Sequence, residues 1–262
     1  LESGFWATTG HIWKHKNAVT VDALGETLLL TRQYATYGDV RFAQTARAAA
    51  YNTFTPDERD QDLNNSGNHG ARLVMARDLG FAAVAISDAA SAWGKGVRRA
   101  LRRVILIRPS IVVVEDRAEF DKEEPGVQNW NTLGAWRQLD VTTCDLRVGR
   151  ARARLTVVTP EDITINITED CIHLEKAPDA ERMHRGEFYR ERQVFRAAFV
   201  SPPATQHRIL TVIQIAEEAD KEPTSLIDVL QASPLVVDIA QGNRTTRIGP
   251  GEEKISQGSA AG

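Results

Sequence analysis

A short segment near the N-terminus combines side chains that can move protons and bind anionic ligands. His11 and His15 flank Trp13, and Lys16 and Asn17 follow directly. Because imidazole titrates near neutral pH, either histidine could act as an acid or a base. Trp13 has polar neighbours and is the best candidate for an exposed aromatic platform. We therefore predict His11 and His15 as catalytic residues and Trp13, Lys16 and Asn17 as substrate-binding residues.

The same segment also allows a structural interpretation. A surface histidine beside aromatic residues can lie at the end of a strand, and Asn17 suits a turn or a strand end. Tryptophan is more often part of a core or its margin than a ligand platform. Catalysis requires a geometry that residue types alone do not show, so both interpretations stay open at this point.

The densest group of cationic side chains lies further along the chain. It comprises Arg98, Arg99, Arg102, Arg103 and Arg108. Guanidinium forks suit carboxylates, so we predict Arg98 and Arg102 as ligands of an anionic substrate. The alternative, which opposite charges across neighbouring strands favour, is a solvated sheet face whose arginines pair with Glu115, Asp116 and Glu119 across the hairpin.

Other kinds of site find no support in the residue pattern. His69, His173, His184 and His207 are scattered without metal-ligand spacing, so we predict no metal site. No nucleophile elbow or phosphate-binding loop is visible, and we predict no cofactor. The two cysteines, Cys144 and Cys171, could form one bridge or remain two buried thiols.

The elements that must position these residues are predicted to be strands. Residues 102–108 and 111–117 are rich in β-branched side chains and flank Pro109, whose fixed φ suits a turn, so they predict a buried hairpin. Many short strands with turn signals between them, and no sustained helical period, indicate an all-β fold. We expect a large antiparallel β-sandwich, supersandwich-like, with long loops and little helix.

The expected organisation is one β-sandwich domain over residues 1–262, whose start could cut through a longer domain. The polar residues 52–70 predict a long surface loop, and residues 257–262 predict a flexible tail. A net charge of −3 with interspersed signs argues against a nucleic-acid binder. No apolar run approaches the roughly 20 residues of a membrane span, so we expect no membrane partner.

Three segments, in this order, resemble one known family. Trp13–Glu26 (WKHKNAVTVDALGE) is similar to a "KN or HN, apolar strand, D-G-x-G-Q" block, with Ala23 in place of Gly and Glu26 in place of Gln. Ser87–Trp93 (SDAASAW) is similar to "G-D-A-[ST]-x-A-Y". Arg102–Asp116 is similar to "R-x-V-x-F-x-[KR]-P-x-x-x-[VI]-x-D". Together they resemble the C-terminal β-domain of heparinase II/III-like polysaccharide lyases, including the oligo-alginate lyase branch.

The resemblance implies a function as well as a fold. Family members join an N-terminal α-helical toroid to a C-terminal β-sandwich and cleave uronic-acid polysaccharides by β-elimination in the cleft between the two. The implied partners are an acidic polysaccharide or oligosaccharide and a missing N-terminal helical domain, and the implied location is periplasmic or secreted. We expect this chain alone to be inactive. The alternative is a non-catalytic carbohydrate-binding or structural β-sandwich module that uses Trp13 and the arginines.

Overall fold

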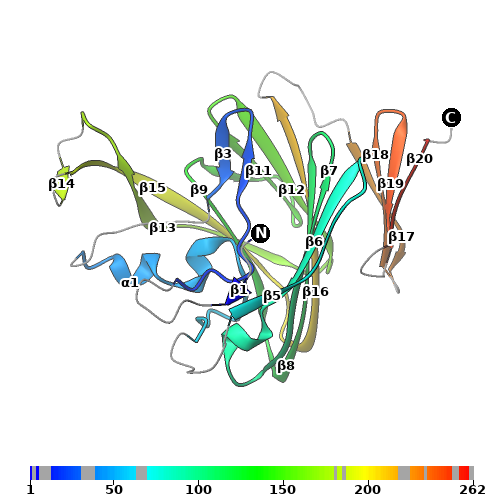
Figure 1. Cartoon of the computed structure of the whole chain (residues 1–262), viewed down its shortest axis with the longest axis horizontal. Coiled ribbons are helices and arrows are strands. Elements are labelled where there is room, and N and C mark those ends of the chain that lie inside the picture. Colours follow the sequence, from blue (N-terminus) through cyan, green and yellow to red (C-terminus); the bar gives the residue numbers. More distant parts are fainter. Residues whose placement is uncertain are drawn as a thin grey trace.

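The described part of the chain is built almost entirely of antiparallel strands. A computed structural model describes residues 1, 4–5, 13–30, 39–62, 70–179, 182–184, 187–217, 225–232, 235–249 and 254–259. Its few helices are short: α1 (Phe42–Thr45) and the 3₁₀ turns η1 (Ala48–Tyr51) and η2 (Ala90–Trp93). The structure therefore confirms the all-β, sandwich-like class that the strand pattern predicted (Figure 1).

A nine-stranded sheet forms the centre of the molecule. Its strands, in spatial order, are β1 (Gly4–Phe5), β5 (Gly70–Asp78), β6 (Ala82–Asp88), β7 (Val97–Ile107), β8 (Ile111–Glu124), β16 (Ala204–Glu217), β12 (Ala151–Thr159), β11 (Thr143–Val148) and β10 (Trp136–Gln138). The predicted hairpin is confirmed as β7 and β8, which pair from Val97 with Phe120 to Ile107 with Ile111.

A second layer lies against the inner face of this sheet. It contains β13 (Thr164–Lys176), β15 (Glu187–Val200), β9 (Gly126–Thr132) and β4 (Phe54–Pro56), with β14 (Arg182–His184) paired to β15. A separate hairpin consists of β2 (Val21–Ala23) and β3 (Glu26–Leu29). The main hydrophobic core lies between the layers and includes Trp130, Phe199 and Ile213, all fully buried. Burial of such side chains is the dominant stabilising term of the fold.

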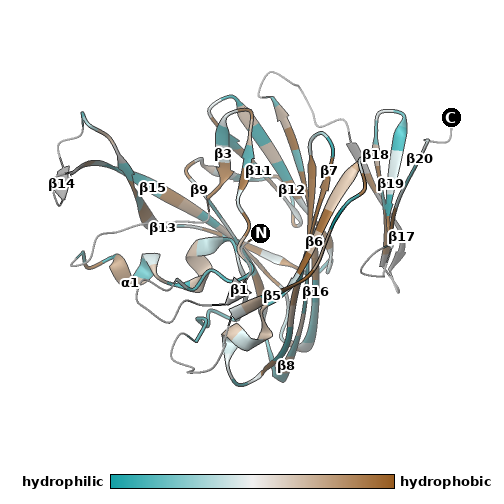
Figure 2. Ribbon diagram, viewed as in Figure 1, coloured by the Kyte–Doolittle hydropathy of each residue, from teal (hydrophilic) through white to brown (hydrophobic). Residues whose placement is uncertain are grey.

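A four-stranded sheet packs on the outer face of the central sheet. Its strands are β17 (Ser225–Ala232), β18 (Leu235–Gln241), β19 (Arg244–Ile248) and β20 (Ile255–Ser259). A second core joins Ile105 and Val113 of the central sheet to Val237 and Ile239 of β18. The centre of β7 and β8 is thus buried on both faces, which explains their continuous apolar runs. Figure 2 shows this apolar character along β6 and β7.

Two expectations about irregular segments need correction. The stretch 52–70 begins with β4, whose residues pair with Gly126, Val127 and Gln128 of β9, and Asn52, Thr53 and Thr55 are fully buried. Polar side chains can be buried when hydrogen-bonded, and Thr53 Oγ1 donates to the carbonyl of Ala48. Residues 63–69 of this stretch lie outside the described residues.

The expected flexible tail is also shorter than residues 257–262. Gln257, Gly258 and Ser259 belong to β20 and pair with Thr246, Thr245 and Arg244 of β19. Ordered strand pairing therefore extends to Ser259. Residues 260–262 lie outside the described residues.

Candidate functional site

Most of the predicted site residues fall within the described part of the chain. Trp13, His15, Lys16 and Asn17 are described, and so are Arg98 and Arg102. His11 lies outside the described residues, and its role stays a prediction.

Lys16 and Asn17 hold the N-terminal segment against the sandwich. The side chain of Gln61 accepts a hydrogen bond from Lys16 N at 3.0 Å and donates one to Lys16 O at 2.8 Å. Asn17 has a left-handed backbone (φ 63°), and its Nδ2 donates to the carbonyl oxygens of Ser87 and Ala100 at 3.3 and 3.0 Å. Because Lys16 and Asn17 are only 6 % and 5 % exposed, the structural interpretation fits both better than direct substrate binding.

Arg102 is a buried connector, which corrects the expectation that it binds substrate. Its side chain is 0 % exposed, and its guanidinium forms a bidentate pair with Asp116, both distances being 2.7 Å. The remaining nitrogen, Nη1, donates to the carbonyl oxygens of Asn17 and Asn52. The guanidinium carbon also lies 5.9 Å from the centre of the Trp130 ring. Arg102 therefore fixes the N-terminal segment to the core and is not accessible to a glycan.

The other arginines of the sequence cluster point in different directions. Arg98 is 63 % exposed and pairs with Asp121 at 2.6 Å, whereas Arg108 pairs with Asp78 at 3.0 Å at the opposite end of β7. Arg103 pairs with Glu115 on the outer face of the sheet. The cross-strand pairing of the alternative is thus confirmed for Arg102 and Arg103, but both side chains are buried and do not form a solvated face. Alternation along β7 separates residues that are adjacent in sequence.

Trp13 and His15 form a half-buried aromatic group with Tyr51 of η1. The Trp13 and Tyr51 ring centres lie 6.4 Å apart, and those of His15 and Tyr51 lie 6.0 Å apart. Trp13 also lies 6.2 Å from the ring of Phe42. Tilted contacts at these distances are favourable aromatic packing. Trp13 and His15 are intermediate in exposure, so the group lies at the margin of the core and is not an open platform.

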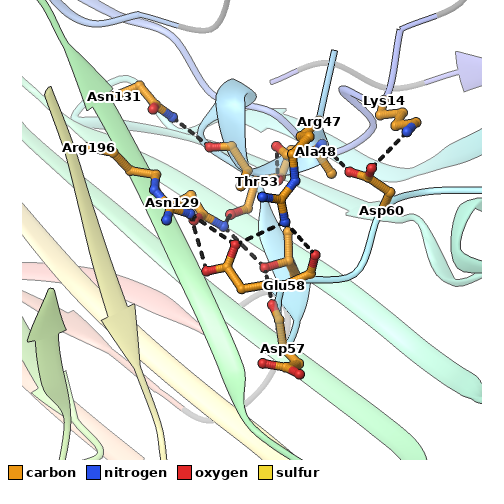
Figure 3. Close-up of polar contacts among 12 residues, drawn as sticks. Lys14, Arg47, Ala48, Thr53, Asp57, Glu58, Asp60, Asn129, Asn131 and Arg196 are labelled. Carbon is orange, nitrogen blue, oxygen red and sulfur yellow. Dashed lines mark hydrogen bonds and ion pairs between the residues drawn. The ribbon is translucent and has the colours of Figure 1, made fainter. Parts of the chain in front are cut away.

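Lys14, which lies between Trp13 and His15 in the chain, belongs to a network of charged side chains (Figure 3). Asp60 accepts from Lys14 Nζ at 2.8 Å and from the backbone N–H of Ala48 at 2.7 Å, which connects the N-terminal segment to η1. Glu58 in the next turn pairs with Arg47 and with Arg196 of β15, both at 3.2 Å. We call Trp13, Lys14, His15, Arg47 and Glu58 the N-terminal site.

Sequence reasoning did not single out the charged members of this site. Arg47, Glu58 and Arg196 are far apart in the chain, and strands β9 and β15 bring them together. Asn129 of β9 contributes by donating to Thr53 O and Thr55 Oγ1 and accepting from Arg196, each at 3.1–3.2 Å. No local pattern marks such a set, because its spacing depends on strand order.

The N-terminal site can bind anions and exchange protons. Arg47 and Lys14 keep 42 % and 24 % of their side chains exposed, so either could meet a carboxylate while paired with an acid. The imidazole of His15 could give or take a proton. Among the described residues, no three His, Cys, Asp or Glu side chains gather to hold a metal ion.

Two further features bear on the sequence predictions. Cys144 is a free, buried thiol, and burial together with Asp140 and Asp145 raises its pKa to about 12. The side chain of Cys171 lies outside the described residues. No helix in the described part of the chain is long and apolar enough to cross a membrane.

Comparison with solved structures shows the fold that this chain shares. It matches a heparinase III gene product with a TM-score of 0.64 and 11 % identity, covering 96 % of this chain and 37 % of that one. It matches heparan sulfate lyase HepC from Pedobacter heparinus with a TM-score of 0.62 and 9 % identity, covering 95 % and 37 %. No family model and no curated protein sequence matches. The likeness confirms, at the level of the fold, the resemblance found in the sequence, and the chain spans just over a third of the proteins it matches.

Proposed function

We propose that this chain is the β-sandwich part of a heparinase-like polysaccharide lyase that cleaves uronic-acid-containing glycans by β-elimination. The observation that carries the proposal is the fold likeness over 95–96 % of the chain to heparinase III and heparan sulfate lyase structures. The three sequence segments that resemble heparinase II/III-like lyases support it independently. An acidic polysaccharide substrate would place the protein in the periplasm or outside the cell.

β-Elimination at a uronate requires three chemical roles. A cation or hydrogen-bond donor neutralises the carboxylate, a base removes the C5 proton, and an acid protonates the leaving oxygen as the C4–O bond breaks and the C4–C5 double bond forms. In this proposal Arg47 and Lys14 bind the uronate, and His15, with His11, gives or takes a proton. Trp13 contacts a sugar ring.

An N-terminal helical domain completes the active site in this proposal. The five residues of the N-terminal site are all partly or fully exposed, so in this proposal they supply one side of a cleft and exclude water poorly by themselves. We therefore expect the chain alone to bind acidic glycans weakly and to show no turnover.

The test compares the chain alone with a longer protein in which an N-terminal helical domain precedes it. Heparan sulfate, alginate and chondroitin-type glycans are the substrates, and the ultraviolet absorbance of the unsaturated product is the readout. We expect turnover of at least one glycan only in the longer protein, with a loss of about 100-fold in kcat for His15→Gln. His173→Gln, on β13, is the matched control and should keep full activity.

Two results would argue against the lyase. Glycan binding without product in the longer protein would favour the non-catalytic carbohydrate-binding module, for which Trp13 and Arg47 suffice. Failure to bind any acidic glycan would leave a structural role only.

A further inference from the structure

The contact between His15 and Tyr51 joins two segments that are remote in the sequence. His15 precedes β2, whereas Tyr51 is the last residue of η1. Their ring centres lie 6.0 Å apart, with an angle of 53° between the ring planes. An asparagine follows each of them within two residues, Asn17 after His15 and Asn52 after Tyr51. The placement of His15 against Tyr51 therefore depends on how these two asparagines are held together.

Both asparagines have a left-handed backbone. The φ angle is 63° at Asn17 and 47° at Asn52. Residues other than glycine rarely adopt this conformation, and asparagine tolerates it because its short amide can bind nearby backbone groups. Asn17 is 5 % exposed and Asn52 is fully buried. Each asparagine therefore fixes, inside the protein, the direction in which the chain leaves its aromatic residue.

The guanidinium of Arg102 binds both turns through a single nitrogen. Nη1 carries two hydrogens and donates to the carbonyl oxygens of Asn17 at 2.7 Å and of Asn52 at 2.5 Å. Nε and Nη2 are held by the two carboxylate oxygens of Asp116, each at 2.7 Å. Because a bidentate pair fixes the plane of the guanidinium, Nη1 cannot move without breaking the ion pair. The two turns are thus joined at one fixed point.

The amide side chains of the asparagines complete this connection. Asn52 Nδ2 donates to Val19 O at 2.9 Å, which is a further bond between the two segments. Asn52 Oδ1 accepts from the backbone N–H of Asn131 in β9 at 2.6 Å, and Asn17 Nδ2 donates to carbonyl oxygens of β6 and β7. Both turns are therefore bound to each other and to the sheets. We call Arg102, Asn17 and Asn52 the buried clamp.

The cationic residues of the N-terminal site are anchored by other groups. Lys14 Nζ donates to Asp60 at 2.8 Å, and Arg47 Nη2 lies 3.2 Å from Glu58. Neither of these two contacts involves a residue of the buried clamp. Loosening the clamp should therefore displace the imidazole of His15 more than it displaces the two cations.

We propose that Arg102, Asn17 and Asn52 are positioning residues that hold His15 in one orientation against Tyr51. A proton-transferring group must be held within about 0.5 Å of its productive position, so residues that fix it raise the rate without touching the substrate. The effect of the clamp on the orientation of His15 follows from the contacts above. Its effect on turnover rests on the proposed function.

The direct test is the NMR signal of the His15 ring in the 262-residue chain, prepared with isotope-labelled histidine. His15→Gln identifies the signal by removing it. A neighbouring aromatic ring moves such a signal away from its value in the urea-unfolded protein, so the signal reports the placement of the two rings. Tyr51→Leu measures how much of this shift comes from Tyr51.

Two substitutions at Asn52 separate the backbone turn from the side chain. Asn52→Gly keeps the left-handed turn and loses the amide, whereas Asn52→Ala disfavours the turn as well. We expect the His15 signal to move part of the way toward its unfolded value in Asn52→Gly and further in Asn52→Ala. Leu24→Gly is the matched control, because Leu24 also has a positive φ, 56°, but lies in the turn between β2 and β3. It should leave the His15 signal unchanged.

Substitutions at the other clamp residues keep the test decisive if an Asn52 variant does not fold. Asn17→Gly and Asn17→Ala should repeat the graded movement, and Arg102→Lys should also move the signal because lysine lacks the planar fork. Urea unfolding verifies that each variant is folded. An unchanged His15 signal in the folded alanine variants, or equal movement in Leu24→Gly, would overturn the proposal.

Turnover by the longer protein with an N-terminal helical domain tests the consequence for catalysis. In Asn52→Gly we expect kcat to fall about tenfold and KM to stay within about twofold, because the two cations keep their own anchors. A raised KM with unchanged kcat would contradict a positioning role. If the longer protein turns over no glycan, the proposed function fails, and the NMR comparison still decides whether the clamp positions His15.

Discussion

Two arginine–carboxylate pairs lie next to each other on β7 and β8 and face opposite sides of the central sheet. Arg102 pairs with Asp116 between the layers, and Arg103 pairs with Glu115 on the outer face. The inner pair is balanced, one charge against one, and its spare donor meets backbone carbonyls. The outer pair carries two additional arginines. One hairpin thus has a one-to-one ion pair on its inner face and a carboxylate shared by three arginines on its outer face.

The pKa of Glu115 reflects the crowding of the outer face. Burial opposes ionisation of this carboxyl, but the charges of Arg103, Arg117 and Arg208 outweigh burial and hold its pKa below the ordinary value. Burial likewise lowers the pKa of Arg103, against the attraction of Glu115. Glu115 is therefore ionised at neutral pH.

Breaking the balanced inner pair should have the largest effect on stability. Arg102→Met leaves Asp116 buried with Gln128 as the one remaining side-chain donor among the described residues, and should lower the free energy of unfolding by about 3–5 kcal/mol. Urea denaturation measures the change. Replacing both partners, Arg102→Met with Asp116→Leu, should recover part of it, whereas a loss below about 1 kcal/mol in the single variant would contradict a structural role for the pair.

Removing the carboxylate of the outer cluster should lower the free energy of unfolding by less than breaking the inner pair does. Glu115→Gln removes the negative charge that three arginines share, but Arg117 and Arg208 are partly solvated, so we expect a loss of about 2 kcal/mol in the free energy of unfolding at pH 7. Because the folded-state pKa of Glu115 is lowered, its contribution is present above the unfolded carboxyl pKa and disappears as pH falls through the folded value. The difference in free energy of unfolding between the wild type and Glu115→Gln, measured in urea, should therefore shrink toward pH 3. A difference independent of pH would contradict this account.

Replacing a neutral polar side chain at the paired ends of β8 and β16 should lower the free energy of unfolding by a smaller amount. His207, opposite Ala118 of β8, accepts from Ser201 Oγ at Nδ1 (2.8 Å), and its Nε2 faces the carbonyl oxygens of Glu124 and Ala204. His207→Leu should cost about 1.5 kcal/mol at pH 7, measured in urea.

The pH dependence of this cost follows from the environment of the imidazole. Burial lowers the pKa of His207 and outweighs the pull of the two carbonyl groups, so the unfolded chain binds the proton more readily. The wild type should lose stability as pH falls below about 6.5 and through the folded pKa of His207. The difference in free energy of unfolding between the wild type and His207→Leu should therefore narrow between pH 7 and 5. A widening difference would show that His207 is protonated in the folded protein.

The smallest effect should come from an ion pair exposed to solvent. Glu58→Gln removes the partner of Arg47 and Arg196, yet Glu58 is 43 % exposed, so the loss should be about 0.5 kcal/mol or less and should vanish in high salt. The same change removes the negative charge beside both arginines and should tighten binding of an acidic glycan, measured by calorimetry. Weaker glycan binding would place the ligand away from the N-terminal site.

The sequence was sufficient for the fold class and for the hairpin, because β-branched runs and Pro109 act locally. It could not assign the arginines to faces with confidence, since a one-residue shift in register reverses inside and outside. The buried role of Arg102 depends on Asn17 and Asn52, which are remote in the chain. The charged part of the N-terminal site depends on strand order, which places Arg196 of β15 beside Glu58.

The burial of the first residues of the 52–70 stretch could not be predicted from the sequence for a related reason. Thr53 and Thr55 have the composition of a surface loop, and their hydrogen bonds to Ala48, Asp57 and Asn129 explain their burial. A polar composition predicts exposure only if the side chains have no hydrogen-bond partners. The partners of Thr53 and Thr55 become visible only in the tertiary structure.

The most direct test of the proposed function is the formation of unsaturated product from heparan sulfate by the longer protein, with His15 intact and with His15→Gln. The account predicts product from the intact protein, a loss of about 100-fold in kcat for the variant, and retained glycan binding in both. Equal turnover in the two proteins would contradict a catalytic role for His15. Binding without any product from the intact protein would contradict the lyase itself.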